Sequence, residues 1–193
     1  ALCLHALSAA GARPCARKTV VVVARLQSAS FEAAAAEDWV DLYTARYANC
    51  QQPAGKSNLH AEAFLVRDGR LRDALRRLPA AGVARLLLYL TYQPCHYSGG
   101  HTREAMARSP FSCTELLLDY ARLVLEPRRV QLVCRVSYLY RAHWQPGLCP
   151  ATYAPAIARA RQGLRLLQRA PGVSVESFGP SDWAFLIGLC DAT

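Results

Sequence analysis

The sequence predicts an α/β fold, with a mixed sheet of about five strands covered by helices. Three observations favour this class. Short apolar runs rich in β-branched residues recur along the 193 residues, and segments with helical spacing separate most of them. Hydrophobic residues make up 52% of the chain, which is enough for one substantial core. Strands joined through a helix of about a dozen residues should run parallel, whereas the first two strands are close enough for a hairpin.

The first half of the chain predicts a hairpin, two helices and a buried strand. Residues 19–26 (TVVVVARL) are rich in β-branched residues, and residues 39–47 (WVDLYTARY) alternate well enough to be the hairpin partner. After a polar loop, we expect a helix at about residues 59–67 and a second, basic one at 71–78. Residues 83–91 (VARLLLYLT) form a nearly continuous apolar run, which is typical of a buried central strand.

The second half predicts alternating helices and strands. Residues 113–125 have helical spacing, with apolar side chains on one face, and residues 130–138 form the next strand. Residues 155–169 form an amphipathic helix with arginines on its outer face. A last strand over 173–178 precedes a final helix, for which Ser181 is the expected N-cap. The expected order is therefore β-β-α-β-α-β-α-β-α.

Residues 19–193 should form one domain, preceded by an N-terminal segment over residues 1–18. The chain begins with an apolar stretch of small residues (ALCLHALSAAG). This stretch fits either the remnant of a signal peptide or a first helix of the domain. No stretch of about 18 uncharged apolar residues exists, so we expect no transmembrane helix and no membrane partner.

The chain is strongly basic. Its 23 lysines and arginines against 14 acidic residues give a formal net charge of +9. This balance favours a polyanionic partner, most often nucleic acid. A merely soluble basic surface would explain the same charge, so charge alone leaves the partner open.

The cysteine content leaves the cellular compartment open. If two of the eight cysteines bind a metal, six remain, and three disulfides could use them in an oxidising compartment. Buried thiols in a cytosolic protein are the alternative, because cysteine packs well as a small hydrophobe. Localisation therefore stays open between a secreted protein and a cytoplasmic or nuclear one. The six cysteines are Cys3, Cys15, Cys50, Cys134, Cys149 and Cys190.

Two short motifs combine residue types that bind zinc and move protons. The tripeptide His60-Ala61-Glu62 stands at the start of an expected helix, and Pro94-Cys95 stands at the end of the buried strand. In this topology both can meet at one end of the sheet. A neutral histidine and two thiolates hold zinc tetrahedrally with one position open, where the metal lowers the pKa of water. A nearby carboxylate that does not bind the metal, here Glu62, can then move protons to the substrate.

These residues resemble the zinc-dependent deaminases, whose signature is H-x-E followed by P-C-x-x-C. Ser98 stands where the second cysteine of that signature would be, and the next cysteine is Cys113. Cys113 opens the helical segment CTELLLDYARL, as the second cysteine does in the family, so we interpret residues 96–112 as an insertion between two ligands. Three alternatives to Cys113 as the third ligand remain: His96 is the ligand, His101 is the ligand, or Cys113 is only a core thiol.

The stretch LTYQPCHYSGG…SCTELL resembles the divergent vertebrate branch called novel, or secreted novel, AID/APOBEC-like deaminases. The resemblance covers residues 20–189 in element order, although the specific motifs occupy a small part of it. It implies a cytidine-deaminase-like fold, with zinc as the cofactor held by His60, Cys95 and Cys113. It also implies that Glu62 is the catalytic residue in the hydrolytic deamination of cytosine to uracil in single-stranded DNA or RNA.

The resemblance also implies where the substrate binds. The family places a recognition loop after the fourth strand, where Tyr138, Tyr140 and Trp144 close or follow that strand, with Arg135 and Arg141 among them. Aromatic side chains stack on the bases of single-stranded nucleic acid, and basic grooves hold its backbone. For Tyr138, packing in the core is the alternative.

Two further substrate candidates flank the metal motifs. Tyr92 lies in the stretch TYQPC, where better-known members of the family have Ser-Trp-Ser-Pro-Cys. Asn58 lies just before His60 and could bond the sugar of a nucleotide. The candidate substrate-binding residues are therefore Asn58, Tyr92, Tyr138, Tyr140 and Arg141.

Three other functions fit parts of this pattern. A deaminase of free cytidine or deoxycytidine would use the same zinc site, although such enzymes tend to be shorter and to close their pocket by oligomerising. A catalytically inactive, zinc-stabilised nucleic-acid-binding protein would need the metal ligands but not the carboxylate of Glu62. A cysteine hydrolase would use Cys95 and His60; nothing in the sequence supplies its oxyanion geometry, and measuring the zinc content would settle this alternative. The sequence leaves the oligomeric state open.

Overall fold

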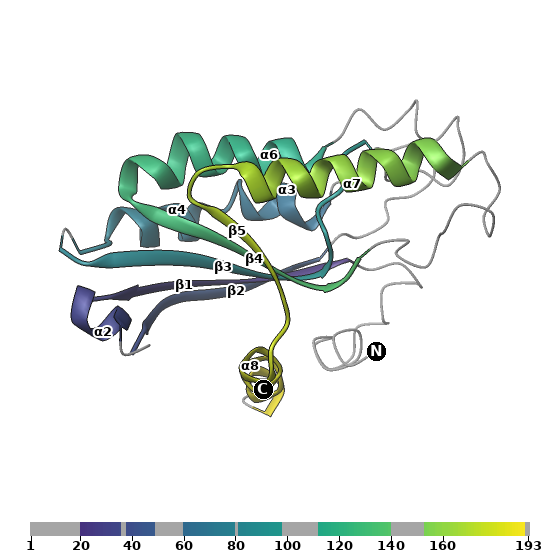
Figure 1. The fold of residues 1–193 in the computed structure, drawn as a ribbon. Helices are drawn as coiled ribbons and strands as arrows, with labels where there is room; N and C mark the ends of the chain where they lie inside the picture. The colour runs from purple at the N-terminus through teal and green to yellow at the C-terminus, as the bar shows by residue number, and fades with distance from the viewer. Residues whose placement is uncertain are drawn as a thin grey trace.

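The computed structural model describes residues 20–35, 38–48, 60–79, 81–97, 112–139 and 153–191. These residues form a five-stranded mixed sheet with helices on both faces (Figure 1). The predicted α/β class, with a mixed sheet covered by helices, is confirmed. Within the described residues, no helix is both long enough and apolar enough to span a membrane. The segment expected over residues 1–18 lies outside them.

The sheet combines antiparallel and parallel pairing. Its strands are β1 Val21–Ala29, β2 Val40–Ala48, β3 Val83–Tyr92, β4 Val130–Tyr138 and β5 Val173–Ser177. They lie in the order β2-β1-β3-β4-β5. β1 pairs antiparallel with both β2 and β3, whereas β4 pairs parallel with both β3 and β5. The predicted pairing of the first two strands is therefore correct, and so is the parallel pairing in the second half.

Most helices coincide with expected segments. They are α2 Phe31–Ala35, α3 Ala61–Leu65, α4 Gly69–Arg76, α6 Cys113–Tyr120, α7 Ala154–Arg169 and α8 Pro180–Asp191. The helix expected over 113–125 changes after α6 into a wider π turn at Ala121–Leu125 and a 3-10 turn at Glu126–Arg128. α2 is an addition to the predicted order, because a helix of five residues is too short to show a helical period.

The helical connections bring the ends of several strands to one edge of the sheet. The connections through α3 and α4, through α6 and through α7 each join two strands that run in the same direction. β2 and β3 are not neighbours, since β1 lies between them, but both run antiparallel to β1. The carboxyl ends of β2, β3 and β4 therefore lie at the same edge, as Figure 1 shows.

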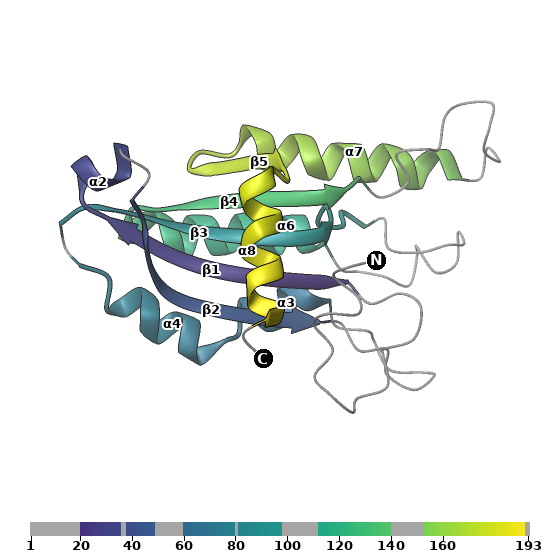
Figure 2. The same cartoon turned by 90° about the horizontal axis from the view of Figure 1, so that it is seen from below.

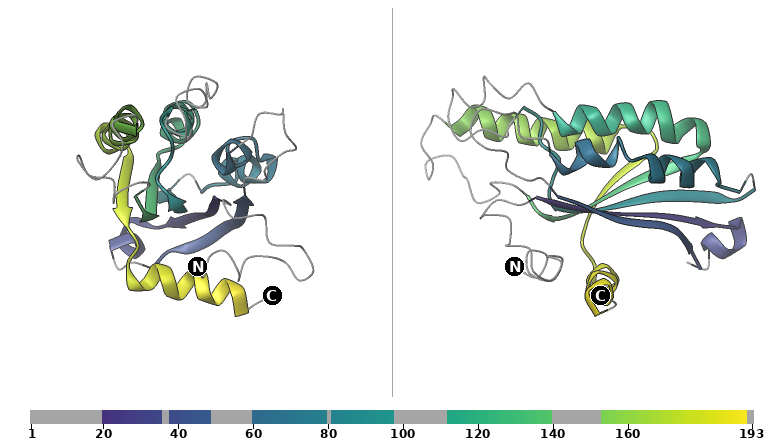
Figure 3. Two further views of the ribbon diagram at one scale, coloured as in Figure 1. Left: turned by 90° about the vertical axis from the view of Figure 1, so that its right-hand side faces the viewer. Right: turned by 180° about the vertical axis from the view of Figure 1, so that it is seen from behind.

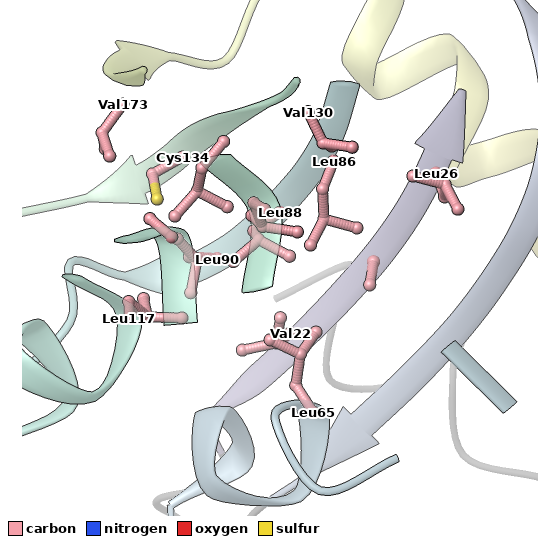
Figure 4. Packing of buried hydrophobic residues seen from close by; sticks show 14 of the residues in the cluster. Val22, Leu26, Leu65, Leu86, Leu88, Leu90, Leu117, Val130, Cys134 and Val173 are labelled. Carbon is pink, nitrogen blue, oxygen red and sulfur yellow. The ribbon is translucent and has the colours of Figure 1, made fainter. Parts of the chain in front are cut away.

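The main core lies between the sheet and the helices α3, α4, α6 and α7 (Figure 4). Alternate residues of β3, namely Leu86, Leu88 and Leu90, are completely buried there. Leu65 of α3 and Leu117 of α6 belong to the same cluster. Burying one such side chain contributes about 1.5–3 kcal/mol relative to leaving it exposed, so these contacts hold both helices firmly on the sheet.

α8 covers the opposite face of the sheet, as the view from below and the end-on view show (Figures 2 and 3). Leu186 of α8 packs there with Leu87 and Tyr89 of β3. The rings of Phe178 and Phe185 lie against Tyr89, with centroid distances of 5.9 Å and 5.3 Å. Both faces of β3 are therefore buried, in agreement with its continuous apolar run.

The start of α8 differs from the expectation. Its carboxylate cap is Asp182, which accepts a hydrogen bond from the backbone N–H of Gly179 at 2.7 Å. The expected N-cap at Ser181 is wrong, because the helix already begins at Pro180. Proline suits the first helical position, since its missing N–H would have no partner there in any case.

Arg135 of β4 points to the face of the sheet that α8 covers, opposite to the face of Tyr138. Its guanidinium donates to the buried carboxylate of Asp182 and lies 3.3 Å from the carboxylate of Glu176. Burial of an arginine is tolerated when carboxylates pair with it in this way. The expectation that Arg135 belongs with the substrate-binding residues is therefore wrong.

α7 approaches the rest of the fold very closely at Gly163. A Cβ atom at this position would lie 2.5 Å from Cβ of His96 and 2.8 Å from Oγ1 of Thr114. Only glycine, which has no Cβ, allows this approach without displacement. By contrast, Gly188 of α8 is exposed, and a Cβ there would have nothing within 4 Å.

We predict that Gly163→Ala destabilises the fold although alanine is the better helix former. Helix propensity favours alanine by about 1 kcal/mol, but forcing a methyl group into this contact costs about 1–3 kcal/mol. Gly188→Ala is the matched control, and it should gain up to about 1 kcal/mol. Urea unfolding followed by circular dichroism measures both changes in the free energy of unfolding. If Gly163→Ala proves as stabilising as Gly188→Ala, the close packing of α7 is wrong.

Candidate metal centre

Three side chains that can bind a metal ion meet at the edge where β2 and β3 end. The Nδ1 atom of His60 lies 3.1 Å from Sγ of Cys113 and 3.3 Å from Sγ of Cys95. All three donor atoms lie within 4.8 Å of one another. Among the described residues, this is the one group of three or more His, Cys, Asp or Glu side chains close enough to hold a metal ion. The structure thus brings together the three residues that the sequence motifs single out.

The fold delivers each of these side chains from a different element. His60 directly precedes α3, in the connection that leaves β2, and Cys95 follows β3. Cys113 is the first residue of α6, and the hydroxyl of its N-cap Ser112 accepts a 3.1 Å hydrogen bond from the backbone N–H of Glu115. Because β2 and β3 end at the same edge and α6 begins there, the three ligands reach one place.

The donor set suits a zinc ion. Zn–S bonds of about 2.3 Å and Zn–N bonds of about 2.0 Å in a tetrahedron place nitrogen and sulfur about 3.5 Å apart. The two distances from His60 to the cysteine sulfurs are only slightly shorter. With the three ligands found among the described residues, one tetrahedral position would be open, which is typical of catalytic and not of structural zinc sites. The group could therefore hold a metal ion with an exchangeable fourth ligand.

Contact between the two thiols shifts their pKa values in opposite directions. Hydrogen bonding to Cys113, together with contact with His60, lowers the pKa of Cys95 and so favours its thiolate form. The same contact with Cys95, reinforced by burial, raises the pKa of Cys113. Hydrogen bonding to Cys95 raises the pKa of His60. The cluster thus already favours one sulfur anion, which is the form of cysteine that binds metals.

Glu62 is a buried carboxyl group beside these ligands. It lies in the first turn of α3, two residues after His60, and is only 3% exposed. Burial raises its pKa above the usual range for a carboxyl group. Its Oε2 atom is buried and has no hydrogen-bond partner among the described residues. A buried polar atom without a partner costs free energy, and at a candidate site it is the kind of atom that an ion, a water or a substrate completes.

Tyr92 and Tyr138 form an exposed aromatic pair at the same edge. They are register partners in the parallel strands β3 and β4, and their ring centroids are 6.4 Å apart. Side chains alternate between the two faces of a strand, and Leu90 and Val136 point into the main core. Tyr92 and Tyr138 lie two residues further along, so they point to the same face, which α3, α6 and α7 cover. Tyr92 is 37% exposed and Tyr138 is 58% exposed. The alternative that Tyr138 packs in the core is therefore wrong.

The remaining candidates have different outcomes. His96, an alternative ligand, is buried with its Nδ1 atom 3.0 Å from Oγ of Ser112 and does not belong to the metal-binding group. Cys134 lies in the main core, as the buried-thiol alternative expects, and the thiol of Cys190 donates to a backbone carbonyl of α8. The candidates that lie outside the described residues are Asn58, His101, Tyr140, Arg141, Trp144, Cys3, Cys15, Cys50 and Cys149.

Thr114 and Ser112 are contacts of the centre that the motifs do not indicate. Thr114 is completely buried, and it donates from its backbone N–H to the Cys95 carbonyl and from its hydroxyl to the Pro94 carbonyl. The pattern Ser112-x-x-Glu115 before an apolar run is a capping-box signal, which identifies Ser112 as the start of a helix. No sequence pattern indicates the contacts of Thr114, because its partners lie in another element.

Comparisons with known proteins assign no family to the chain. No protein-family model matches it, and no curated protein matches it. Among solved structures, the chain is similar to Rib2 deaminase of Aspergillus oryzae, in a structure of a C-terminal deletion mutant at pH 6.5 in complex with DARIPP. The identity is 17%, the match covers 92% of this chain and 79% of that chain, and the TM-score is 0.45. A second structure of the same deletion mutant at pH 6.5 has 15% identity, the same coverage and a TM-score of 0.43. These values are too low to assign a family or an activity.

We predict that the purified protein carries zinc and that Cys113→Ser removes it, because serine provides no thiolate ligand. Cys190→Ser is the matched control, since Cys190 lies in α8 and its thiol donates to the Leu186 carbonyl at 3.2 Å. Ser98→Ala should also keep the metal, although Ser98 holds the position of the missing signature cysteine. Metal analysis by mass spectrometry measures the zinc content of each variant. Full zinc occupancy in Cys113→Ser would show that the ligand assignment is wrong.

Proposed function

We propose that the protein is a zinc-dependent deaminase, which hydrolyses cytosine to uracil in single-stranded DNA or RNA. The observation that carries this proposal is the buried carboxyl group of Glu62 beside the candidate ligand Cys113. In the part of the chain that the structure describes, its Oε2 atom has no hydrogen-bond partner. A structural zinc site does not need such a carboxyl group, and burying one costs free energy. The arrangement therefore favours an enzyme over a zinc-stabilised binding protein.

The order of the site residues along the chain supports the deaminase assignment. His60 and Glu62 lie at the start of α3, Cys95 follows β3 and Cys113 begins α6. The signature H-x-E followed by P-C-x-x-C has the same order. The stretch TYQPC extends the proposal to the divergent AID/APOBEC-like branch of these deaminases.

The residues of the centre would divide the reaction between them. His60, Cys95 and Cys113 would hold zinc, which supplies a Lewis acid that activates water at neutral pH. Glu62 accepts a proton from the attacking water at its Oε2 atom. Glu62 passes this proton to the ring nitrogen N3 of cytosine, then takes the remaining proton from the hydroxyl added at C4 and delivers it to the departing amino group. Water and cytosine thus give uracil and ammonia, and Glu62 returns to its starting form.

Exposed aromatic rings at the edge of the site support a single-stranded polynucleotide as the substrate. A base inside a duplex is stacked and paired, so a deaminase needs a base that is out of the stack. Tyr92 and Tyr138 offer ring faces at the edge that carries the ligands, where the target base or its neighbour could stack. The net charge of +9 would attract the phosphate backbone. Asn58, Tyr140 and Arg141 remain candidates for further contacts with the substrate.

Glu62→Gln should abolish deamination while the fold and the zinc content stay unchanged. Glutamine has nearly the same volume as glutamate, but it cannot accept and release the proton that each turnover requires. Glu126→Gln is the matched control, because Glu126 is exposed in the turn after α6. Sequencing of a single-stranded oligonucleotide after incubation measures the conversion of cytosine to uracil. Substantial conversion by Glu62→Gln would rule out the proton-transfer role.

Tyr138→Ala should weaken the binding of a single-stranded oligonucleotide by about 1–3 kcal/mol, the usual value of stacking one base on an aromatic ring. Phe31→Ala is the matched control, since it removes an exposed ring from α2 at the opposite end of the sheet (Figure 1). Fluorescence anisotropy measures both affinities. Equal losses in the two variants would contradict stacking on Tyr138.

Raising the salt concentration should weaken the binding of an oligonucleotide strongly, because its binding releases many counterions, and should hardly affect the binding of a free nucleoside.

The choice of substrate separates the remaining functions. If free cytidine is deaminated well and oligonucleotides are not, the nucleoside-deaminase alternative replaces the polynucleotide one. If the zinc-loaded protein binds oligonucleotides and deaminates neither substrate, the catalytically inactive binding protein replaces both.

A further inference from the structure

The two cysteines of the metal centre are close in space although residues 96–112 separate them in the sequence. In the P-C-x-x-C signature, a short turn of the chain holds the two cysteines together. This chain lacks that turn, yet the sulfur atoms of Cys95 and Cys113 lie within 4.8 Å of each other. Contacts between separate elements must therefore set the distance between the two ligands.

Four hydrogen bonds, which we call the ligand bracket, join residues 94–97 to residues 112–115. Thr114 donates two of them, one from its hydroxyl and one from its backbone N–H. Every residue from 94 to 97 has a partner at the start of α6. The four pairs are the Pro94 carbonyl with the Thr114 hydroxyl at 3.3 Å, the Cys95 carbonyl with the Thr114 N–H at 2.9 Å, His96 Nδ1 with Ser112 Oγ at 3.0 Å, and the Tyr97 hydroxyl with the Glu115 carboxylate.

The bracket is buried where it lies nearest to the metal ligands. Thr114 is 0% exposed, and His96 and Ser112 are buried as well. Water cannot replace these bonds, so losing one would leave a buried carbonyl or hydroxyl unsatisfied. Tyr97, at the exposed end, has a φ of 53°, a left-handed backbone conformation that non-glycine residues rarely adopt. The bracket holds the chain after Cys95 in this unfavourable conformation.

Helix α7 packs against the bracket from outside. A Cβ atom at Gly163 would touch both His96 and Thr114, which lie on opposite sides of the bracket. The guanidinium of Arg159, in the same helix, donates to the carbonyl of Tyr97 at 3.4 Å. α7 therefore contacts both halves of the bracket and keeps them from separating.

We propose that Thr114 is a positioning residue for the metal centre, on which it acts through the backbone of Cys95. Its two hydrogen bonds fix the carbonyls of Pro94 and Cys95 relative to α6, which Cys113 begins. Thr114 thereby does for this chain what the short turn between the cysteines does in the signature. This inference rests on the proposed function, because it assumes that the cluster binds zinc.

The test compares Thr114→Val with Thr114→Ser in the full chain. Valine keeps the shape of the side chain and removes the hydroxyl, whereas serine keeps the hydroxyl. We expect Thr114→Val to weaken zinc binding about tenfold or more, measured by competition with a chromogenic chelator, and Thr114→Ser to stay near the wild type. After zinc is replaced by cobalt, Thr114→Val should also shift the visible absorption bands, which report the geometry of the ligands.

Thr91→Val is the matched control. The hydroxyl of Thr91 also donates to a backbone carbonyl, that of Val21 at 3.2 Å, but it points to the face of β3 opposite to Tyr92. Thr91→Val should lower the thermal stability and leave the zinc affinity and the cobalt spectrum unchanged. Ser112→Ala, which removes the partner of His96, provides a second test of the bracket, and it too should weaken zinc binding.

The outcomes for this inference and for the proposed function are distinct. Wild-type zinc affinity and an unchanged cobalt spectrum in both Thr114→Val and Ser112→Ala would overturn the inference. An equal loss of zinc affinity in Thr91→Val would overturn it as well. If Thr114→Val loses zinc but the zinc-loaded wild type deaminates no cytosine, the inference holds and the proposed function fails.

Discussion

The parallel pairing of β3 with β4 is the constraint on which the rest of the structure depends. A parallel partner requires the chain to cross back over the sheet, and α6 makes that crossing. Leu88 and Leu90 of β3 lie in the same core cluster as Leu117 of α6, so burial of apolar surface fixes the crossing. Because α6 must begin at the edge where β3 ends, Cys113 and Cys95 come together despite the length of chain between them. The candidate site is therefore a consequence of topology and core packing.

Local sequence patterns predict much of this arrangement. A strand that is buried on both faces is a continuous apolar run, and a strand buried on one face alternates apolar and polar residues. The strand expected over residues 130–138 has the observed bounds, and two arginines, Arg128 and Arg129, directly precede its apolar residues. The helix expected to start at Cys113 does so. The meeting of His60 with Cys95 also follows from strand directions alone, because two strands that run the same way end at the same edge.

The features that sequence patterns do not predict depend on contacts between elements that are far apart in the sequence. Ser181 is a good N-cap residue by type, but the carboxylate of Asp182 reaches the N–H of Gly179 and the helix begins earlier. Arg135 lies next to substrate candidates in the sequence, whereas its side chain pairs with Asp182, 47 residues away and on the other face of the sheet. The role of Thr114 depends on how two separate segments lie together, and no spacing within either segment encodes it.

The ligand bracket separates the shape of the metal centre from the length of the segment that joins its two cysteines. Closing a longer loop costs little entropy, about 0.6 kcal/mol for each doubling of its length. The bracket and Gly163 hold both ends of this segment, so residues inserted between Tyr97 and Ser112 do not strain the ligands. Evolution could therefore lengthen or exchange the segment between Tyr97 and Ser112 while His60, Cys95 and Cys113 keep their arrangement, much as antibodies vary their binding loops on an unchanging scaffold.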